Sequence, residues 1–572
     1  MTRNLPPRGG SSRAPTNSPE QPQLDRAVIE ADYLGASTRC LPSIDNRRAP
    51  GDPTSVPGQR QGNVGPAILN FTRPLAAAVD AAARAPTRAG RVTPGANVNA
   101  HVVTRAVEAL RTAAPALSAG CRMWLWQYIA CGLAFGAALG LVLTAPGLAS
   151  TGVLVATATI FIGVSFFRVI VLAAAIGRTA RLPCEAAPAP LRSGLPTYCV
   201  LVPLYREAAL VPDLIDALAA LDYPPAKLDV VLILEECDRA TCARVARAAL
   251  PPYMRFIIVP DRQPRTKPKA LNMALALSRG EFVAVFDAED VPAPDQLRKA
   301  AAAFLATPGR YACLQARLAI HNPRQSMITR QFALEYAALF HAFLPALVRL
   351  GLPLPLSGTS NHFPRAVLEN ALAWDPFNVT EDADLGIRLT RAGGTIGLLD
   401  SATLEEAPAT PGQWLPQRTR WIKGWMQTYL VHTRRPWRLL RQLGAWRCFG
   451  FHALFAGFLV SALTYPLMLA AIGFELSRPT PFASAPGTLH RAALTVALTE
   501  AATGVLAALL TAVIGAWRGG LVRLAGHLLA APFHWLAISV ATYRALGQMI
   551  RRPHFGEKTR HTPRRRLRTA LR

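Results

Sequence analysis

The 572-residue chain lacks the cysteine pattern of a disulfide-stabilised or zinc-binding protein. Its nine cysteines are scattered, and only Cys237 and Cys242 come close together in the sequence. A disulfide framework or a zinc site would need cysteines at regular, paired spacings, so neither is expected. We predict reduced, mostly buried thiols.

Acidic residues are also scarce, with 35 Asp and Glu against 62 Lys and Arg, which gives a net charge of +27. A basic excess of this size would suit nucleic acid, but no recognition module accompanies it. The basic residues cluster beside apolar runs and at both ends of the chain, which is typical of anchoring next to anionic lipid. We therefore expect membrane lipids, and no nucleic acid, as partners.

Long apolar runs are abundant. Hydrophobic residues make up 51% of the chain and the mean hydropathy is +0.21, too apolar for an ordinary soluble enzyme. Five runs are long enough to cross a bilayer. They lie at 124–145, 153–176, 449–474, 492–517 and 524–546. In the second run Arg168 must snorkel or face a polar partner, and a buried helix of a soluble domain is the alternative for that run.

Composition divides the chain into seven regions. Residues 1–95 are rich in Pro, Gly, Arg and Ser without apolar periodicity, which predicts disorder, and no signal peptide is evident there. The other predicted regions are a possible amphipathic helix at 96–121, two transmembrane helices at 122–180, an α/β domain at 195–432, an interfacial helix at 434–447, two or three transmembrane helices at 448–550 and a basic cytoplasmic tail at 551–572.

The basic tail raises a question of topology. Two crossings before a cytoplasmic domain and three after it would leave the tail outside, against the preference of basic residues for the cytoplasm. One of the last apolar segments is therefore expected to be interfacial or re-entrant. The run Pro532-Phe533-His534-Trp535 is the strongest candidate.

Short apolar runs alternate with helical patterns between about residues 196 and 432. Such alternation predicts parallel strands joined by crossover helices, with ligands bound beyond the carboxyl ends of the strands. Strands are predicted at 198–203, 230–234, 256–260 and 282–287, and helices at 210–221 and 269–277.

Polar clusters lie at the expected strand ends. Asp287 and Glu289, in the run Asp-Ala-Glu-Asp at 287–290, can hold a hard divalent ion that neutralises a diphosphate, although acidic residues after a strand are also common in turns. Lys267 and Lys269 precede a helix, where cations and amide N–H groups can meet phosphate. Helix-flanking lysines are usually solvated, so these two lysines support a phosphate site only when the other motifs are present as well.

Two later motifs also have two interpretations. Glu381, Asp382 and Asp384 open a helical pattern after Thr380, so they either favour the helix dipole or supply a general base, Asp382. Gln417, Arg420 and Trp421 share one helical face. That face suits diphosphate neutralisation and sugar stacking, or simply membrane anchoring.

Taken in order, these motifs resemble the family 2 glycosyltransferases with a GT-A fold, an α/β Rossmann-like domain between transmembrane segments. The resemblance covers about residues 195–432, the expected catalytic domain, and is strongest to the membrane-embedded, processive branch of cellulose, chitin and hyaluronan synthases. Within that branch, the runs at 235–238, 287–290 and 557–561 are most similar to the subgroup that contains phage N4 adsorption protein B.

The resemblance implies a role for each motif residue. Asp382 is the implied general base and Glu289, with Asp287, the implied ligand of Mg²⁺ or Mn²⁺. The implied nucleotide-sugar contacts are Pro203, Tyr205, Glu236, Lys267 and Asp287. The implied diphosphate and acceptor contacts are Gln417, Arg420, Trp421, Ser357 and Gly358.

Several positions depart from the family pattern. Glu235-Glu236 stands where Asp-Asp is more usual, and Glu289 replaces the second Asp of a D-x-D element, each keeping the charge on a longer side chain. Gly556 occupies a position at which the subgroup tends to have Trp, and the N-terminal region has no recognisable accessory domain.

The resemblance implies an inverting transfer from a nucleotide sugar, expected to be a UDP-sugar, that makes a β-linked polysaccharide at a bacterial inner membrane, with the catalytic domain in the cytoplasm. The alternatives are a non-processive enzyme that adds one sugar to a lipid acceptor, and a catalytically idle export subunit or phage receptor. Expected partners are a nucleotide sugar, a glycan or lipid acceptor and membrane lipids, with an accessory or export subunit as a further candidate.

Overall fold

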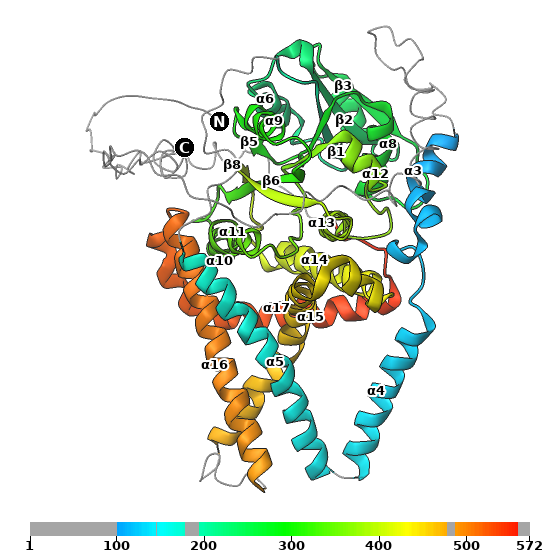
Figure 1. The fold of residues 1–572 in the computed structure, drawn as a ribbon. Helices are drawn as coiled ribbons and strands as arrows, with labels where there is room; N and C mark the ends of the chain where they lie inside the picture. Colours follow the sequence, from blue (N-terminus) through cyan, green and yellow to red (C-terminus); the bar gives the residue numbers. More distant parts are fainter. Residues whose placement is uncertain (1–99, 145, 178–193, 478–486, 559–572) are drawn as a thin grey trace, which may run out of the picture. The chain divides into compact units, whose positions relative to one another are not determined.

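The fold was analysed in a computed structural model that describes residues 100–144, 146–177, 194–477 and 487–558 (Figure 1). The expected disorder of residues 1–95 lies outside the described residues, as does most of the basic tail. The six cysteines whose side chains the structure describes are free thiols, and three of them are buried.

One eight-stranded sheet forms the centre of the α/β domain, in the order β3-β2-β1-β4-β7-β6-β8-β5. The four predicted strands, β1 to β4, are present and parallel, and the antiparallel strand β7 then makes the sheet mixed. The strands are β1 (Tyr198–Leu204), β2 (Leu228–Glu235), β3 (Met254–Val259), β4 (Phe282–Val285), β5 (Val291–Pro292), β6 (Tyr311–Ile320), β7 (Asn361–Pro364) and β8 (Thr395–Glu405).

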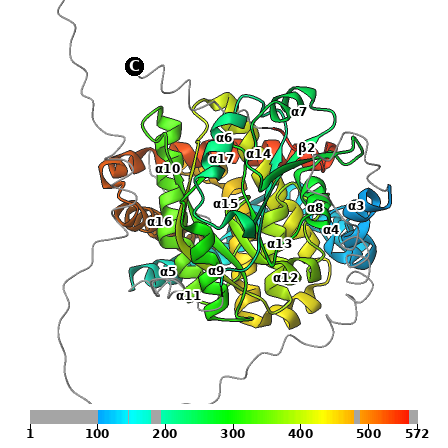
Figure 2. The same cartoon turned by 90° about the horizontal axis from the view of Figure 1, so that it is seen from above.

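Continuous apolar runs such as that of β1 form parallel strands because helices cover both faces of the sheet. Those helices are α6 (Val211–Ala219), α7 (Arg239–Ala246), α8 (Lys267–Leu277), α9 (Gln296–Ala306), α12 (Arg365–Asn370) and α13 (Glu381–Arg391). The amphipathic helix α3 (Ala100–Ala113) lies beside α8 in both views (Figure 2). Its buried side chains Val103, Val107 and Leu110 form the apolar face that the sequence pattern predicts.

Long helices lie on the other side of α13. They are α4 (Leu125–Thr144), α5 (Pro146–Ile176), α10 (Met327–Ala338), α11 (Leu344–Arg349), α14 (Pro411–His432), α15 (Pro436–Leu476), α16 (Gly487–Arg518) and α17 (Ala531–Arg551). Within the described residues, five helical stretches are long and apolar enough to cross a membrane: 158–176, 327–349, 436–470, 491–518 and 522–551. Arg168 of α5 does face a polar partner, since its guanidinium lies 3.4 Å from the Ser461 hydroxyl of α15.

The directions of these helices differ. In Figure 1, α4, α5 and α16 extend away from the sheet, whereas α17 runs crosswise beneath α14, against which it packs. Helix α15 is kinked at Gly444, whose φ of +72° is left-handed and therefore suits glycine. The kink separates the arginine- and tryptophan-rich start of α15 from its apolar remainder.

Helix α16 crosses α10 at a glycine. A Cβ atom on Gly515 would lie 2.4 Å from Cα of Ala338 and 2.6 Å from the carbonyl oxygen of Ala337. Both of these are backbone atoms, so no side-chain rotation can relieve the clash. Gly515 is therefore what allows the two helices to approach so closely.

We predict that Gly515→Ala lowers the free energy of unfolding by about 1–3 kcal/mol, because overpacking forces the two backbones apart. The matched control is Gly547→Ala on α17, where no atom lies within 4 Å of the added methyl group. There the better helix propensity of alanine should leave the stability equal or raise it by up to about 1 kcal/mol. Thermal unfolding in detergent measures both, and equal melting temperatures would contradict the close crossing.

Candidate active site

The site lies where β1, β2 and β4 end. Lys267, the first residue of α8, extends its ammonium group to the Asp287 carboxylate after β4, with Nζ to Oδ1 at 2.5 Å, and to the Gly358 carbonyl at 2.7 Å. A Cβ atom on Gly358 would lie 3.2 Å from Oδ2 of Asp382. Residues between positions 267 and 382 thus meet around one glycine, and Ser357 beside it donates its backbone N–H to Gln315.

The side chain of Asp290, the last residue of the 287–290 run, points into the protein interior and not toward the proposed ligand site. Its Oδ2 accepts the backbone N–H of Asp287 at 2.6 Å and the hydroxyl of Thr359, while the side chain is buried. The Thr359 contact ties the loop after β4 to the loop that contains Gly358. Asp290 is therefore a structural carboxylate that fixes the position of Asp287.

Glu289 points to a narrow hollow that it lines with Asp213, His321 and Glu406. Asp287 and Glu289 supply hard oxygen donors, but the described residues contain no group of three His, Cys, Asp or Glu side chains placed to hold a metal. This donor set fits Mg²⁺ or Mn²⁺, because such ions commonly take one or two carboxylates and complete their shell with phosphate oxygens and water. Among the residues described here, Asp287 and Glu289 are the two carboxylates that would hold such an ion.

The loops after β1 and β2 carry the predicted nucleotide contacts. Pro203 and Tyr205 are partly buried, and the Arg206 guanidinium lies 5.1 Å above the Tyr205 ring. Glu236 is exposed, and its carboxylate accepts the backbone N–H of Asp261 at 2.9 Å. The two loops are joined by Asp238, whose carboxylate accepts the backbone N–H of Arg206 at 2.5 Å.

Helix α14 brings the third motif to the same region. Gln417 is buried and its Oε1 atom has no hydrogen-bond partner, so an acceptor atom is left for a ligand donor. The Arg420 charge acts on both Glu381 and Asp382, which places the guanidinium near the carboxylates. The Trp421 ring packs 5.9 Å from that of Phe332 on α10.

Helices α13 and α14 touch at a second glycine. A Cβ atom on Gly424 would lie 2.2 Å from the hydroxyl oxygen of Thr380, the residue before α13. Thr380 occupies the N-cap position of α13, but its side chain makes no capping hydrogen bond. The contact holds the start of α13, and with it Asp382, directly against the helix that carries Gln417, Arg420 and Trp421.

Sequence reasoning missed three supporting contacts. Arg418 forms a bidentate ion pair with Glu335 of α10, and its guanidinium lies 4.8 Å from the Trp421 ring. Lys269 is fully buried against Glu235, so that carboxylate supports the fold beside the exposed Glu236. Charged residues at positions where a helix should be apolar could have indicated buried ion pairs, but the sequence does not show which residues are their partners.

The third missed contact is the C-terminal strap, residues 552–558. Lys423 of α14 is buried and donates to Gln548 and to the carbonyl oxygens of Arg552 and Phe555, and burial lowers its pKa to about 8. The strap ends in an ion pair between Lys558 and Glu207, after β1. It thus runs from α17 across α14 to the loop of the predicted nucleotide contacts.

Burial and charge set the protonation of the site. Burial raises the pKa of Glu381 to about 7, with a further increase from Asp382 and opposition from Lys267 and Arg420. Burial also raises the pKa of Asp382. Burial opposes the charge of Lys267, but Asp287, Glu381 and Asp382 outweigh it and raise the pKa of that ammonium. The lysine therefore stays charged among the carboxylates.

The sheet order and the clustered carboxylates define a GT-A-like α/β domain. Residues 196–424 match the family described as "Glycosyltransferase like family 2". The β-monoglucosyldiacylglycerol synthase of Synechocystis sp. is 29% identical over 241 residues, 42% of this chain and 50% of the relative. Cellulose synthase 2 of Novacetimonas hansenii is 26% identical over 53% of this chain and 19% of its own length.

Similar solved structures include the mannosyltransferase PcManGT from Pyrobaculum calidifontis, in complex with GDP-Man and Mn²⁺. It is 22% identical, with a TM-score of 0.47, and the match covers 69% of this chain and 99% of that one. The chain spans about half the length of the first curated relatives that it matches.

We predict that Glu381→Gln stabilises the protein at high pH. Between pH 4.5 and 7 the folded protein keeps a proton on Glu381 that the unfolded chain has released, so stability falls as pH rises through this window. At 1.36 kcal/mol per pKa unit the loss amounts to about 3 kcal/mol, which the neutral glutamine avoids. The variant should therefore exceed wild type in melting temperature at pH 8 and lose this advantage near pH 4.5.

The control for this comparison is Glu369→Gln on α12, whose carboxylate is partly exposed and paired with Arg365. A surface ion pair of this kind is worth about 0–1 kcal/mol, so the change should be small. A Glu381→Gln advantage that is the same at both pH values would show that the Glu381 carboxylate is not desolvated in the folded protein.

Proposed function

We propose that the chain is an inverting glycosyltransferase that transfers a sugar from a nucleotide sugar, a UDP-sugar in our proposal, to an acceptor hydroxyl. The convergence of Lys267, Asp287 and Asp382 around Gly358 carries the proposal. It places one cation, one carboxylate at a strand end and one carboxylate at a helix start within a few ångströms of one another. A diphosphate leaving group and an attacking hydroxyl need these groups on opposite sides of one sugar.

The donor lies, in this proposal, across the ends of β1, β2 and β4. Pro203, Tyr205 and Glu236 contact the nucleotide, and Lys267 and Arg420 balance the diphosphate charge. Asp287 and Glu289 would hold Mg²⁺ or Mn²⁺, which when bound neutralises charge on the diphosphate. Binding through fixed charges of this kind favours the state in which the leaving group is most negative.

Asp382 is the proposed base. Its carboxylate accepts the backbone N–H of Ala383 at 2.8 Å, which fixes the side chain at the start of α13. Burial raises the pKa of Asp382 and so makes the carboxylate a better proton acceptor than an exposed aspartate. As the acceptor hydroxyl attacks the anomeric carbon, its proton passes to Asp382 and the bond to the diphosphate breaks, which inverts the configuration.

The acceptor is proposed to be a growing β-linked glycan, held by Gln417, Trp421 and the loop of Ser357 and Gly358. The unpartnered Oε1 atom of Gln417 supports a hydroxyl-bearing ligand there. A lipid acceptor is the second candidate, because the similar proteins include synthases named for β-monoglucosyldiacylglycerol as well as a cellulose synthase. The resemblance to the processive branch favours the glycan.

The crosswise direction of α17 supports a topology for the proposal. If α4, α5, α15 and α16 cross the bilayer and α17 lies at its surface, the catalytic domain and the basic tail fall on the same side. We propose that this side is the cytoplasmic face of a bacterial inner membrane, because nucleotide sugars are made in the cytoplasm. The arginine- and tryptophan-rich start of α15 would then lie in the interface.

Asp382→Asn tests the base. Purified protein in nanodiscs with UDP-glucose and Mg²⁺ should transfer glucose, and the variant should be about 10²- to 10⁴-fold slower because it cannot take the hydroxyl proton. Donor affinity should change little, as measured by nucleotide-sugar binding. Asp216→Asn, an exposed site on α6, is the matched control. Equal transfer rates in Asp382→Asn and wild type would end the assignment of the base.

Product size separates the two acceptors. Processive synthesis predicts a polymer that lengthens with time at a fixed amount of enzyme, resolved by gel electrophoresis of radiolabelled product. Transfer to lipid predicts one labelled species that moves with the lipid fraction and grows only in amount. A lipid-soluble monoglycoside as the sole product would overturn the proposal of a polymerase and leave that of a transferase intact.

A further inference from the structure

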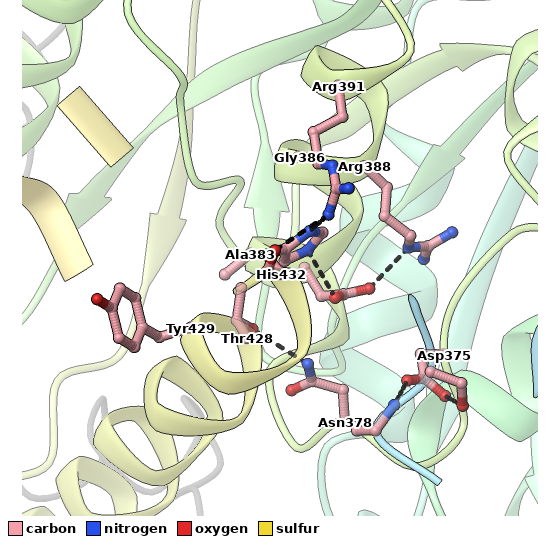
Figure 3. Close-up of polar contacts among 12 residues, drawn as sticks. Asp375, Asn378, Ala383, Gly386, Arg388, Arg391, Thr428, Tyr429 and His432 are labelled. Atoms are coloured by element: carbon pink, nitrogen blue, oxygen red, sulfur yellow. Dashed lines mark hydrogen bonds and ion pairs between the residues drawn. The ribbon is translucent and has the colours of Figure 1, made fainter. Parts of the chain in front are cut away.

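A buried network of charged side chains lies behind the proposed base (Figure 3). Asp384, two residues after Asp382 in α13, is fully buried and accepts from Nε of Arg388 at 2.7 Å. Its other oxygen lies 3.1 Å from Nε2 of His432, the last residue of α14. The His432 ring is also fully buried, and its Nδ1 lies 2.8 Å from the guanidinium of Arg391.

These contacts determine the tautomer of His432. Arginine only donates hydrogen bonds, so Nδ1 of His432 must be the acceptor for Arg391. Nε2 then carries the ring proton and donates it to Asp384. Burial lowers the pKa of His432 to about 4, which keeps the ring neutral at physiological pH. The histidine therefore holds a guanidinium on one side and a carboxylate on the other through one fixed orientation.

The network joins two helices that carry different parts of the site. Two further contacts connect α14 to the loop before α13: Asn378 donates to the Thr428 hydroxyl at 3.1 Å, and the backbone N–H of Val379 donates to Gln427 at 3.0 Å. His432 supplies the contact that reaches α13 itself, inside its first turn. The turn that contains Asp382 is thus held between the Gly424 contact and the His432 contact.

A merely apolar core at this position would cost less to bury than a set of charges. Polar contacts differ from apolar ones in fixing direction, because a hydrogen bond is lost when its partners shift or rotate. Since His432 is fully buried, it touches no substrate. Its effect on the reaction can only pass through the position of α13.

We infer that His432 is a positioning residue for the proposed reaction: by donating to Asp384 it locks the first turn of α13 to α14 and so sets the distance between the Asp382 carboxylate and the ligands held by Gln417, Arg420 and Trp421. The inference rests on the proposed function. It adds a residue outside the motifs and explains why α14 continues for three turns beyond Trp421.

Two amide substitutions separate the two contacts of the ring. In His432→Gln the amide occupies about the position of Nε2 and can still donate to Asp384. In His432→Asn the amide occupies about the position of Nδ1, so it can accept from Arg391 but cannot reach Asp384. The single-turnover transfer rate should be close to that of wild type in His432→Gln. It should fall about 10- to 100-fold in His432→Asn, because a shift of about 1 Å at a reacting group costs that much.

Donor affinity, measured by nucleotide-sugar binding, should be unchanged in both variants, since the nucleotide contacts lie on other loops. The matched control is Tyr429→Phe, which removes a hydrogen bond of 3.1 Å to His452 of α15 and leaves the hydrogen bonds between His432 and α13 in place. It should lower the melting temperature as the His432 variants do but leave the transfer rate unchanged. This control separates loss of stability from loss of position.

Four outcomes would overturn the inference. Equal rates in the Asn and Gln variants would show that the Asp384 contact does not matter, and a rate loss in Tyr429→Phe as large as in His432→Asn would show that stability alone is responsible. Absence of transfer in wild type would overturn the proposed function and the inference with it. A wild-type enzyme that requires Asp382 but tolerates His432→Asn would overturn the inference alone.

Discussion

The ammonium group of Lys267 is the constraint on which the rest of the site depends. Asp287, Glu381 and Asp382 lie close enough to act on its charge, in a region that solvent reaches only in part. Without a partly buried cation such a group of carboxylates would take up protons or move apart. Lys267 lies where it does because it opens α8 just beyond β3, and the Gly358 carbonyl gives its ammonium a second acceptor. A donor diphosphate would meet a site whose own charges are already balanced in part.

Two glycines allow the charged groups of the site to lie as close together as this charge balance requires. Gly358 leaves room beside the Asp382 carboxylate, and Gly424 lets α14 approach Thr380. Any side chain at either position would separate groups that act over a few ångströms. The polar network at the end of α14 then fixes the direction of that approach. Space comes from the glycines and orientation from His432, so neither feature alone would hold the first turn of α13.

The sequence was most informative where function and local pattern coincide. The four first strands and the residues at their ends were predictable, because apolar runs and polar turns are local signals. The inward turn of Asp290 was not, since nothing in the run 287–290 shows which carboxylate meets Thr359 across the chain. The same holds for the C-terminal strap, whose contact with Lys423 joins residues more than 120 positions apart. Contacts of that range depend on the folded arrangement of several elements at once.

Helix α14 links the chemistry to the apolar helices. Arg418 ties it to α10 through Glu335, Lys423 and Gln427 tie it to the strap that follows α17, and Arg434, just past its end, donates to the carbonyl oxygens of Ser118 and Cys121 before α4. A displacement of any of these neighbours is therefore transmitted to the helix that holds Gln417, Arg420 and Trp421. Since α13 is locked to the same helix, we expect Asp382 to move with these residues, which would preserve the distance between the proposed base and the proposed acceptor contacts. Because α13 carries Asp382 and α14 carries the other motif, and the two helices are locked together, movements of the surrounding helices should leave the geometry of the site unchanged.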